Sequence, residues 1–347
     1  MLLELYDFGL EARTLHIAAG LLLGLVFGIA AQITRFCLRR AVAGDASERG
    51  AAGAVWLTAL ATAILAYVIA SGAGFVTLDG HRFASSDVPV LGIVAGGLAF
   101  GIGMVLTRGC VSRLTVLSAT GNLRAAVVLL VFAVVAHACM KGVLSPFVAG
   151  LSANTVSLPF ASFHDLPLGG ALLFLPVAVL AAVLAWRARP DVMHLVLGAV
   201  IGLVAVAGWA TTSVLLFDEF EPLPVQTAAF TLPWTDTLFW IIASSAIPAS
   251  FGVGFVGGAL SGSFLSAAAR GEVALQSFES PAQTARYVAG GALMGVGGVL
   301  AGGCTVGAGL SGVATGGVSA VLALAAIAVG GWAAANVAPS GRAVTAA

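Results

Sequence analysis

Two cysteines occupy equivalent positions of a sequence that repeats itself, and a third lies at a similar break in the chain. Cys110 follows Gly109 at the end of one apolar run, and Cys304 follows Gly303 at the end of another. Cys37 comes shortly after a third apolar run. A thiol is a soft group and a weak S–H donor, so several in a row could hand a sulfur-containing anion from one to the next. Free cysteine also behaves as a small buried hydrophobic residue, but a repeated position is harder to explain by packing alone.

The internal repeat has a nearly constant offset. A shift of 194 positions places Cys110 on Cys304, together with the glycines that precede each of them. The matching positions are 94–97 with 288–291, Gly101 with Gly295, Gly103 with Gly297 and, after a one-residue slip, 119–121 with 314–316.

Gly109 and Gly303 stand directly before the cysteines, where the chain has to turn. Without a Cβ, glycine permits a sharp turn and leaves backbone N–H groups free to face a ligand. The start of a helix adds unpaired N–H donors and a partial positive charge. Several helix starts that converge would therefore bind an anion without a buried lysine. We expect the three cysteines in the first turns of short helices, with Thr305 beside Cys304.

Three polar residues near Cys110 are further candidates for the same site. Charges at membrane depth are rare and usually functional, so Arg108 and Arg113 would either contact the anion or extend to the membrane surface. Asn122 precedes an apolar run and is typical of a residue that caps the start of a helix. No arrangement of histidines or cysteines in the sequence predicts a metal site or a cofactor.

Composition places the chain in a membrane. Of its 347 residues 60% are hydrophobic and 9% are charged, and the mean hydropathy is +1.07. A soluble protein has about 25% charged residues. The net charge is zero, which argues against a nucleic-acid surface. The four cysteines form no CxxC pair, so neither a disulfide framework nor a zinc site is indicated.

The apolar runs predict an all-α integral membrane protein with about nine spans, since a span needs about 20 apolar residues. Four less hydrophobic segments are too short to span and are interpreted as re-entrant or broken helices. We treat residues 1–347 as one membrane domain, with repeat halves at roughly 15–140 and 237–335 joined by spans within 141–236. The predicted spans are 15–34, 51–70, 88–107, 123–140, 168–186, 193–216, 237–258, 287–302 and 318–335, and the short segments are 36–43, 111–119, 262–270 and 305–314.

Arginines predict the orientation, because cytoplasmic loops carry an excess of lysine and arginine. Nine arginines fall in loops on one side if the N-terminus is outside and the C-terminus inside: Arg35, Arg39, Arg40, Arg49, Arg187, Arg189, Arg270, Arg286 and Arg342. The other side receives Arg13, Arg82 and Lys141.

The two repeat matches predict different relative orientations of the matched segments in the membrane. The spans before Cys110 and Cys304 are five apart, so these units should be inverted, which is typical of transporters. A weaker match of 34–37 with 262–265 joins spans that are six apart and predicts the same direction. One span assignment or the weaker match must be wrong.

The motifs around the cysteines resemble those of the YeeE/YedE family of bacterial inner-membrane transporters of sulfur compounds. The resemblance covers nearly the whole chain. It depends on Arg35-Phe36-Cys37, on Arg108-Gly109-Cys110 with residues 119–122, on 302–312, and on a central piece that contains Trp209 and 225–238.

The resemblance implies an hourglass-shaped helical protein whose four short helices meet at the centre. It implies that Cys37, Cys110 and Cys304 line a path for thiosulfate, with Leu265 where symmetry would place a fourth cysteine. Arg108 departs from the family pattern, which more often has a small residue there. A small cytoplasmic sulfur-carrier protein resembling TusA is an expected partner.

Three alternatives remain open at this stage. The first is a permease for another sulfur or selenium species. The second is a membrane thiol oxidoreductase, which the absence of CxxC opposes. The third is a soft-metal channel, because thiolates suit Cu(I). The sequence favours a transporter over an enzyme.

Overall fold

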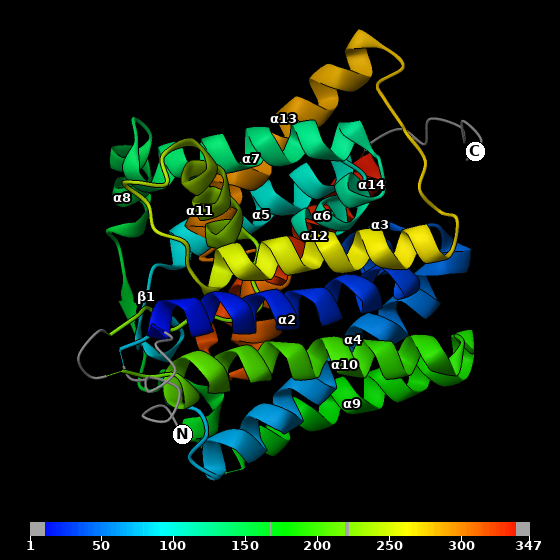
Figure 1. Cartoon of the computed structure of the whole chain (residues 1–347). Coiled ribbons are helices and arrows are strands. Elements are labelled where there is room, and N and C mark those ends of the chain that lie inside the picture. Colours follow the sequence, from blue (N-terminus) through cyan, green and yellow to red (C-terminus); the bar gives the residue numbers. More distant parts are fainter. Residues whose placement is uncertain (1–10, 79, 167, 219–221, 338–347) are drawn as a thin grey trace.

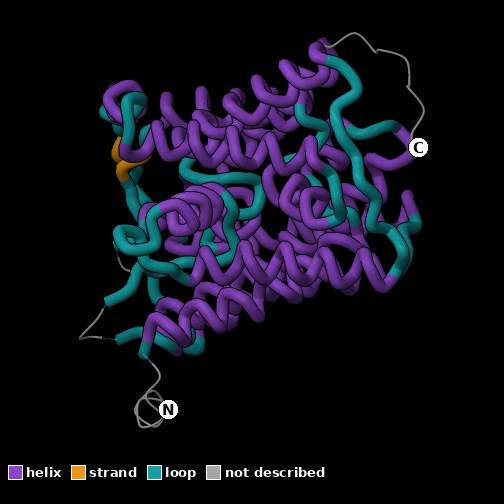
Figure 2. Tube along the Cα trace, turned by 45° about the horizontal axis from the view of Figure 1, so that its top comes forward, coloured by secondary structure: helices purple, strands orange, loops and turns teal. Residues whose placement is uncertain are grey.

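The computed structural model describes residues 11–78, 80–166, 168–218 and 222–337, and its regular structure is almost entirely helical (Figure 1, Figure 2). One short antiparallel ribbon pairs β1 (Asp87–Val88) with β2 (Val156–Ser157). This ribbon lies at the end of the molecule where the first helix, α2, begins (Figure 1). We call this end the β face and the other end the opposite face. Arg342 lies outside the described residues.

Seven helical segments of the described chain are long and apolar enough to cross a membrane. The protein is therefore a multi-pass membrane protein, and the predicted all-α class is confirmed. The segments are Ala12–Ala43, made of α2 (Ala12–Thr34) and α3 (Leu38–Ala43); α4 (Ala46–Gly72); Val90–Ala119, made of α5 (Val90–Leu106) and α6 (Val111–Ala119); α7 (Leu123–Lys141); Val192–Leu215, made of α10 (Val192–Ala210) and the π-helical η3 (Thr211–Leu215); α12 (Phe251–Ala269); and α14 (Val318–Val337).

Two further helices of 20 residues, α9 (Gly169–Ala188) and α13 (Pro281–Leu300), occupy two more of the predicted spans. The number of spans stays a prediction. Three predicted short segments correspond to α3, α6 and the π-helical η4 (Gly307–Gly312). The remaining elements are α8 (Ser145–Ser152), α11 (Thr231–Ile242) and the single 3-10 turns η1 (Arg82–Ala84) and η2 (Phe163–Asp165).

Two sequence predictions are wrong between residues 237 and 270. The predicted span 237–258 is interrupted, because α11 ends at Ile242 and α12 begins only at Phe251. Pro248 lies in the break, and the residue before a proline avoids the helical conformation. The predicted short segment 262–270 is instead the second half of the continuous helix α12. Gly262 does not break the helix. It has no side chain, and this allows α12 to pack closely against another helix.

That other helix is α2, which packs against α12 in parallel through glycines spaced four residues apart. Small residues at this spacing form one face and allow two helix backbones to come into direct contact. A Cβ on any of these glycines would collide with a carbonyl oxygen of the partner helix. The facing pairs are Gly20 with Phe251, Gly24 with Phe255 and Gly28 with Ala259, and in return Gly254 with Ile17, Gly258 with Leu21 and Gly262 with Leu25.

Helices α4 and α10 pack in the same way. Gly198 faces the carbonyl of Val55, and Gly202 faces that of Ala59. Residue numbers rise together along the two helices, so this pair is also parallel. Its contacts have the same four-residue spacing as those between α2 and α12.

Helices α5 and α13, in contrast, cross in antiparallel fashion. Each of them also packs in parallel against one more helix, α5 against α14 and α13 against α7. The unit that carries Cys110 and the unit that carries Cys304 therefore run in opposite directions. The facing pairs are Gly96 with Gly297, Gly103 with Gly290, Gly101 with Ile327 and Gly295 with Phe132.

Candidate functional site

The chain leaves the helix in the same way before each of the three cysteines. The residue two positions earlier has a left-handed backbone, with φ of 52° at Arg35, 58° at Arg108 and 72° at Gly302. At the first two breaks the next N–H bonds to a carbonyl five residues back, from Phe36 to Ala31 and from Gly109 to Met104. This is the Schellman ending of a helix.

The predicted location of the sharp turn was therefore wrong by one residue in the first repeat unit. Sequence analysis assigned it to Gly109, but the left-handed residue is Arg108. Arginine is accepted there because the two backbone bonds that close the helix stabilise a conformation that costs roughly 1–2 kcal/mol for a non-glycine residue. Arg108 is exposed, whereas Gly109 is buried in the turn.

Cys37 and Cys110 come together in the core although they are 73 residues apart. They are the N-cap residues of α3 and α6, as expected for cysteines at the start of short helices. Their sulfurs lie 3.6 Å apart, and the sulfur of Cys110 also lies 3.2 Å from the Ser112 hydroxyl. Both are free thiols. A donor and acceptor chain of S–H and O–H groups thus runs through the start of α6.

Cys304 has a different neighbourhood. It is completely buried and free, and its sulfur accepts the N–H of Gly307 at 3.3 Å. Its carbonyl accepts the N–H groups of Ala308 and Gly309, which leads into the π-helical η4. The next residue, Thr305, is also buried, and its hydroxyl has no hydrogen-bond partner among the described residues. That hydroxyl lies close to the sulfur of Cys110, so it connects the two cysteine units.

A fourth short helix reaches this centre from a direction that sequence analysis missed. Helix α11 begins at Thr231, and its N-cap residue Phe230 is buried against Cys304. Leu265, which was expected at the fourth position, lies within α12 and is 54% exposed. That expectation depended on the wrong assignment of a break at Gly262. Phe230 now occupies the place where the fourth helix start meets the cysteines.

Charged residues near the pair of thiols fall into two groups. Arg113 is close enough to interact electrostatically with Cys37 and Cys110, and its Nη1 is buried without a hydrogen-bond partner among the described residues. Arg35 and Arg108 have exposed side chains. Of these three arginines, Arg113 is therefore the one with a buried nitrogen that lacks a partner in the described part of the chain.

Both polar atoms of the Asn122 side-chain amide form hydrogen bonds within the protein. Its side-chain oxygen accepts the N–H of Ala125, which confirms it as the cap of α7. Its amide nitrogen donates to Gln276 at 2.7 Å. These bonds connect α7 to the loop before α13 and give Asn122 a structural role.

A cavity of about 360 Å³ lies beside the turn that precedes Cys304. Its wall includes Gly302 and Gly303, together with His81, Arg82 and Thr231. Sequence analysis counted Arg82 only for orientation and did not single out His81 or Thr231. In the sequence, these three residues stand out only as polar residues between apolar runs. The tertiary fold places them in the wall of the cavity beside Gly303.

The imidazole of His81 is neutral at physiological pH. Burial and the neighbouring charge of Arg82 lower its pKa to about 4. Its Nδ1 accepts the N–H of Phe83 at 3.2 Å, so the proton of the neutral ring is on Nε2. The ring packs edge-on against Trp209, whose indole N–H donates to the carbonyl of Ser311.

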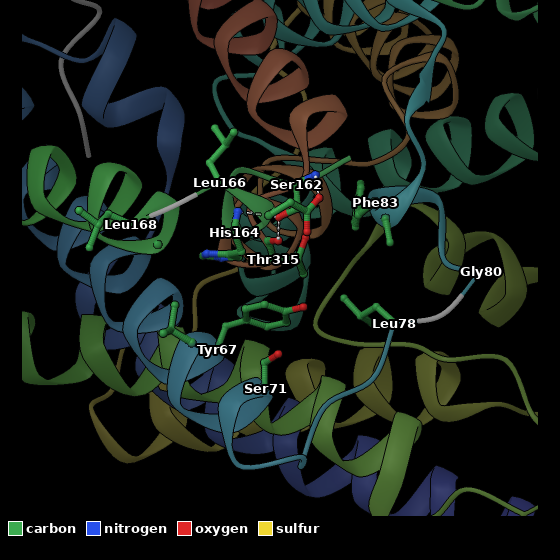
Figure 3. A pocket seen from close by; sticks show the side chains of 14 residues that line it. Tyr67, Ser71, Leu78, Gly80, Phe83, Ser162, His164, Leu166, Leu168 and Thr315 are labelled. Carbon is green, nitrogen blue, oxygen red and sulfur yellow. Dashed lines mark hydrogen bonds between the residues drawn. The ribbon is translucent and has the colours of Figure 1, made fainter. Parts of the chain in front are cut away.

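A second cavity, of about 610 Å³, lies beyond the end of η4 (Figure 3). The rings of Tyr67 and His164 stack there with centroids 5.5 Å apart. Ser162 donates to the carbonyl of Thr315 at 2.8 Å, which ties the 153–168 connection to the end of the Cys304 unit. Asp165 brings a carboxylate to the wall of this cavity.

Cys139 is separate from the other three cysteines. It is buried on α7 and has no sulfur contact in the described part of the chain. Packing therefore explains it. Within the described residues no group of three or more His, Cys, Asp or Glu side chains is placed to hold a metal ion.

These features define a class of protein. Apolar helices that pack through glycines enclose a set of buried thiols at helix breaks, and a cavity lies beside the turn that precedes one of them. This is the architecture of a membrane transporter for a small solute, in which irregular backbone at membrane depth lines the solute's route.

The chain belongs to the sulphur transport (YeeE/YedE) family, whose model matches residues 33–333. The family predicted from the cysteine motifs is thus confirmed. The chain is 27% identical over 331 residues to the thiosulfate transporter TsuA of Escherichia coli (strain K12). This alignment covers 85% of this chain and 86% of that protein. It is 26% identical over 306 residues to the thiosulfate transporter TsuA of Spirochaeta thermophila, with 83% and 88% covered.

Proposed function

We propose that this protein is a permease for thiosulfate uptake across the bacterial inner membrane, with Cys37, Cys110 and Cys304 as a relay. The observation that carries this proposal is the contact of 3.6 Å between two free, buried thiols that come from separate helix breaks. Packing alone does not require the start of α3 to meet the start of α6 through their sulfurs. Two relatives named for thiosulfate support the substrate.

The proposed route runs from the β face to the opposite face. The anion enters through the cavity beside Gly303 and reaches Cys304. It then passes the Thr305 hydroxyl to Cys110 and Cys37, and it leaves near Arg113. Gly109 and Gly303 have no side chain, so the backbone N–H groups beside the cysteines are free to face the anion.

The thiols act as hydrogen-bond donors and are not consumed. Thiosulfate has one terminal sulfur and three oxygens, so a soft S–H donor suits its sulfur end while hydroxyls and N–H groups suit its oxygens. An anion that leaves water for a buried path pays a large desolvation cost unless donors replace its hydration shell. Closely spaced weak donors meet this need without holding the ion so tightly that it cannot leave.

We further infer that the chain consists of two inverted halves, with an N-out, C-in orientation. The antiparallel contact of α5 with α13 supports inversion, and so does the matched pair of parallel contacts α5–α14 and α13–α7. The parallel pairs α2–α12 and α4–α10 point to α10–α12 as the counterpart of α2–α4. The second half would then begin near residue 192 instead of 237. A cytoplasmic partner resembling TusA would receive the sulfur compound on the opposite face.

Growth and uptake test this function directly. A bacterial strain that requires cysteine and has lost its own thiosulfate uptake should grow on thiosulfate as sole sulfur source when it expresses this protein. Cys110→Ala and Cys304→Ala should both reduce growth and the uptake of radiolabelled thiosulfate, at equal amounts of protein in the membrane. Cys139→Ala is the matched control and should behave as the wild type. Wild-type uptake by both relay variants would refute the relay.

One observation favours a second candidate, a membrane thiol oxidoreductase. Cys37 and Cys110 are close enough to form a disulfide, a step that would release two protons and pass two electrons to an acceptor. Thiosulfate uptake into liposomes that contain only the purified protein, with all its thiols reduced before and after, would exclude this role. Uptake of a labelled selenium anion or of another sulfur anion, in place of thiosulfate in the same assay, would identify a different substrate.

A further inference from the structure

Asp236 is an acidic residue within the helical bundle that the relay does not use. Within the described α-helices, acidic residues occur only there, in the middle of α11, and at Glu48, in the first turn of α4. The helix dipole stabilises a carboxylate in a first turn but not one in the middle of a helix. Asp236 is half-buried, and among the described residues its carboxyl forms no hydrogen bond or ion pair. Acidic side chains at membrane depth are rare, and many of them carry protons.

Asp236 lies one helical turn beyond the wall of the cavity of about 360 Å³. Leu232 and Pro233 of α11 line that cavity, and residues three and four positions apart share one face of a helix. On α7 the wall residue is Met140, and the next residue, Lys141, is close enough to Asp236 to interact with its charge. Helix α11 packs against α7 and α12 in this region (Figure 1). The carboxyl is therefore next to the route proposed for the anion.

Two titratable side chains of α7 face this side of α11. Phe239, one turn after Asp236, stacks on the ring of His137 with centroids 3.7 Å apart. Lys141 follows His137 by one turn and is exposed. A change in the charge of Asp236 therefore has one cation and one imidazole as its nearest partners on this helix.

The other helices packed against α11 present no titratable group to Asp236 in the described part of the chain. Helix α12 contains none, and those of α13 lie in its first two turns, far from its contact with α11. Helix α6 lies on another side of α11, where the indole N–H of Trp234 donates to Thr115. His81 and Arg82 belong to the wall of the cavity itself.

We propose that Asp236 takes up a proton when the anion enters, and that the protein thereby carries a proton inward with each thiosulfate. This inference rests on the proposed function and adds its driving force. A dianion and an ionised Asp236 repel each other, so the arrival of the anion favours the protonated carboxyl, and the protonated carboxyl favours the anion by the same factor. The O–H bond forms with a proton from the β face. It breaks, with release of the proton on the opposite face, after the anion has passed Cys304, and Lys141 then attracts the ionised carboxylate.

Movement of a proton with the anion lowers the electrical opposition to uptake. A membrane potential of 100 mV, negative inside, opposes the entry of a dianion by roughly 2,000-fold. One proton reduces the moving charge from two to one, and the opposition falls to roughly 50-fold. A pH gradient adds a favourable factor of about ten for each pH unit.

The test uses liposomes that contain the purified protein, with the membrane potential held at zero by potassium and valinomycin. A gradient of one pH unit, acidic outside, should concentrate radiolabelled thiosulfate about tenfold, because one proton enters with each anion. Asp236→Asn should lose this accumulation and still exchange labelled for unlabelled thiosulfate at equal pH. Glu279→Gln is the matched control, since the Glu279 side chain is 72% exposed, and it should accumulate thiosulfate as the wild type does. His137→Gln should also retain the accumulation.

A second measurement needs no variant. Dicyclohexylcarbodiimide adds to a protonated carboxyl in apolar surroundings, and mass spectrometry of the digested protein measures the adduct at Asp236. Thiosulfate should increase this adduct at constant pH, whereas chloride at the same ionic strength should not.

The outcomes separate proton cotransport from the proposed function. Wild-type protein that exchanges thiosulfate but accumulates none in a pH gradient would overturn cotransport and keep the proposed function. Absence of exchange in the wild type would refute the proposed function itself. Accumulation by Asp236→Asn, or its loss in His137→Gln, would overturn the assignment to Asp236. If Asp236→Asn fails to reach the membrane, the adduct decides, and an adduct that thiosulfate leaves unchanged would overturn the proposal.

Discussion

The two units that carry Cys110 and Cys304 use the same turn and then diverge. Both end a helix with a left-handed residue two positions before the cysteine, Arg108 in one and Gly302 in the other. After Cys110 the chain continues as the regular helix α6, whereas after Cys304 it forms the π-helical η4. A left-handed residue thus precedes both cysteines, and the segment that follows decides what each sulfur contacts.

The difference gives the two ends of the proposed route different chemistry. The sulfur of Cys110 contacts two side chains, the thiol of Cys37 and the hydroxyl of Ser112. The sulfur of Cys304 instead accepts a backbone N–H, and a cavity whose wall includes Arg82 lies beside the turn that precedes it. A single thiol near a cation suits capture, and a pair of adjacent thiols suits transfer.

The largest expected effect separates the centre of the relay from its entrance. Cys110 contacts Cys37 and lies near Thr305, so Cys110→Ala should interrupt the path at its middle. We expect uptake to fall by about 100-fold, which corresponds to the loss of hydrogen bonds to a charged ligand. Cys304→Ala should reduce uptake less, with the larger part of its effect on KM. Equal losses of Vmax in both variants would show that the two units do not differ in role.

Oxidation should distinguish the thiol pair from the single thiol. Diamide should join Cys37 to Cys110 by removing two electrons and two protons, and the resulting disulfide should stop uptake until dithiothreitol restores it. Mass spectrometry of an unreduced digest should find this link and leave Cys304 free. A link that involves Cys304, or full uptake by the oxidised protein, would contradict the comparison.

The hydroxyl of Thr305 should matter for transport and not for stability. Thr305→Val removes a buried group that has no partner, so the melting temperature should stay equal or rise slightly. Uptake should fall about three- to tenfold, because the anion loses one donor between Cys304 and Cys110. Ser112→Ala serves as a comparison on the Cys110 side. A variant with normal uptake would remove Thr305 from the route.

The smallest effects concern the turns themselves. Gly302→Ala should lower stability by about 1 kcal/mol, because φ of 72° disfavours any Cβ although nothing else lies within contact distance. Arg108→Gly should raise stability by about 0.5 kcal/mol through relief of the same strain. Thermal unfolding in detergent measures both changes, with Gly150→Ala in an uncrowded part of α8 as the control. Shifts of the same sign in the two variants would show that the turns are not equivalent.

Sequence reasoning located the cysteines well and the region around α11 poorly. The short helix at 111–119 was predicted with its observed bounds, since Gly109 and Asn122 mark its two ends. The break near Pro248 was missed, because the apolar residues on both sides of it read as one continuous span. Gly262 was taken for a break, because a glycine that ends a helix and one that lets helices touch are identical in sequence.

By itself the sequence determined the membrane location, the helical class and the three thiols at helix breaks. Composition, apolar run length and a repeated Gly-Cys pattern are local properties, and they need no knowledge of neighbours. Only the tertiary structure decided that Cys37 meets Cys110, and that Thr231 of α11 and Arg82 line the same cavity. Each of these depends on segments that are far apart in the chain, and their approach is set by backbone contacts at glycines such as Gly28 and Gly202, whose partners no sequence pattern names.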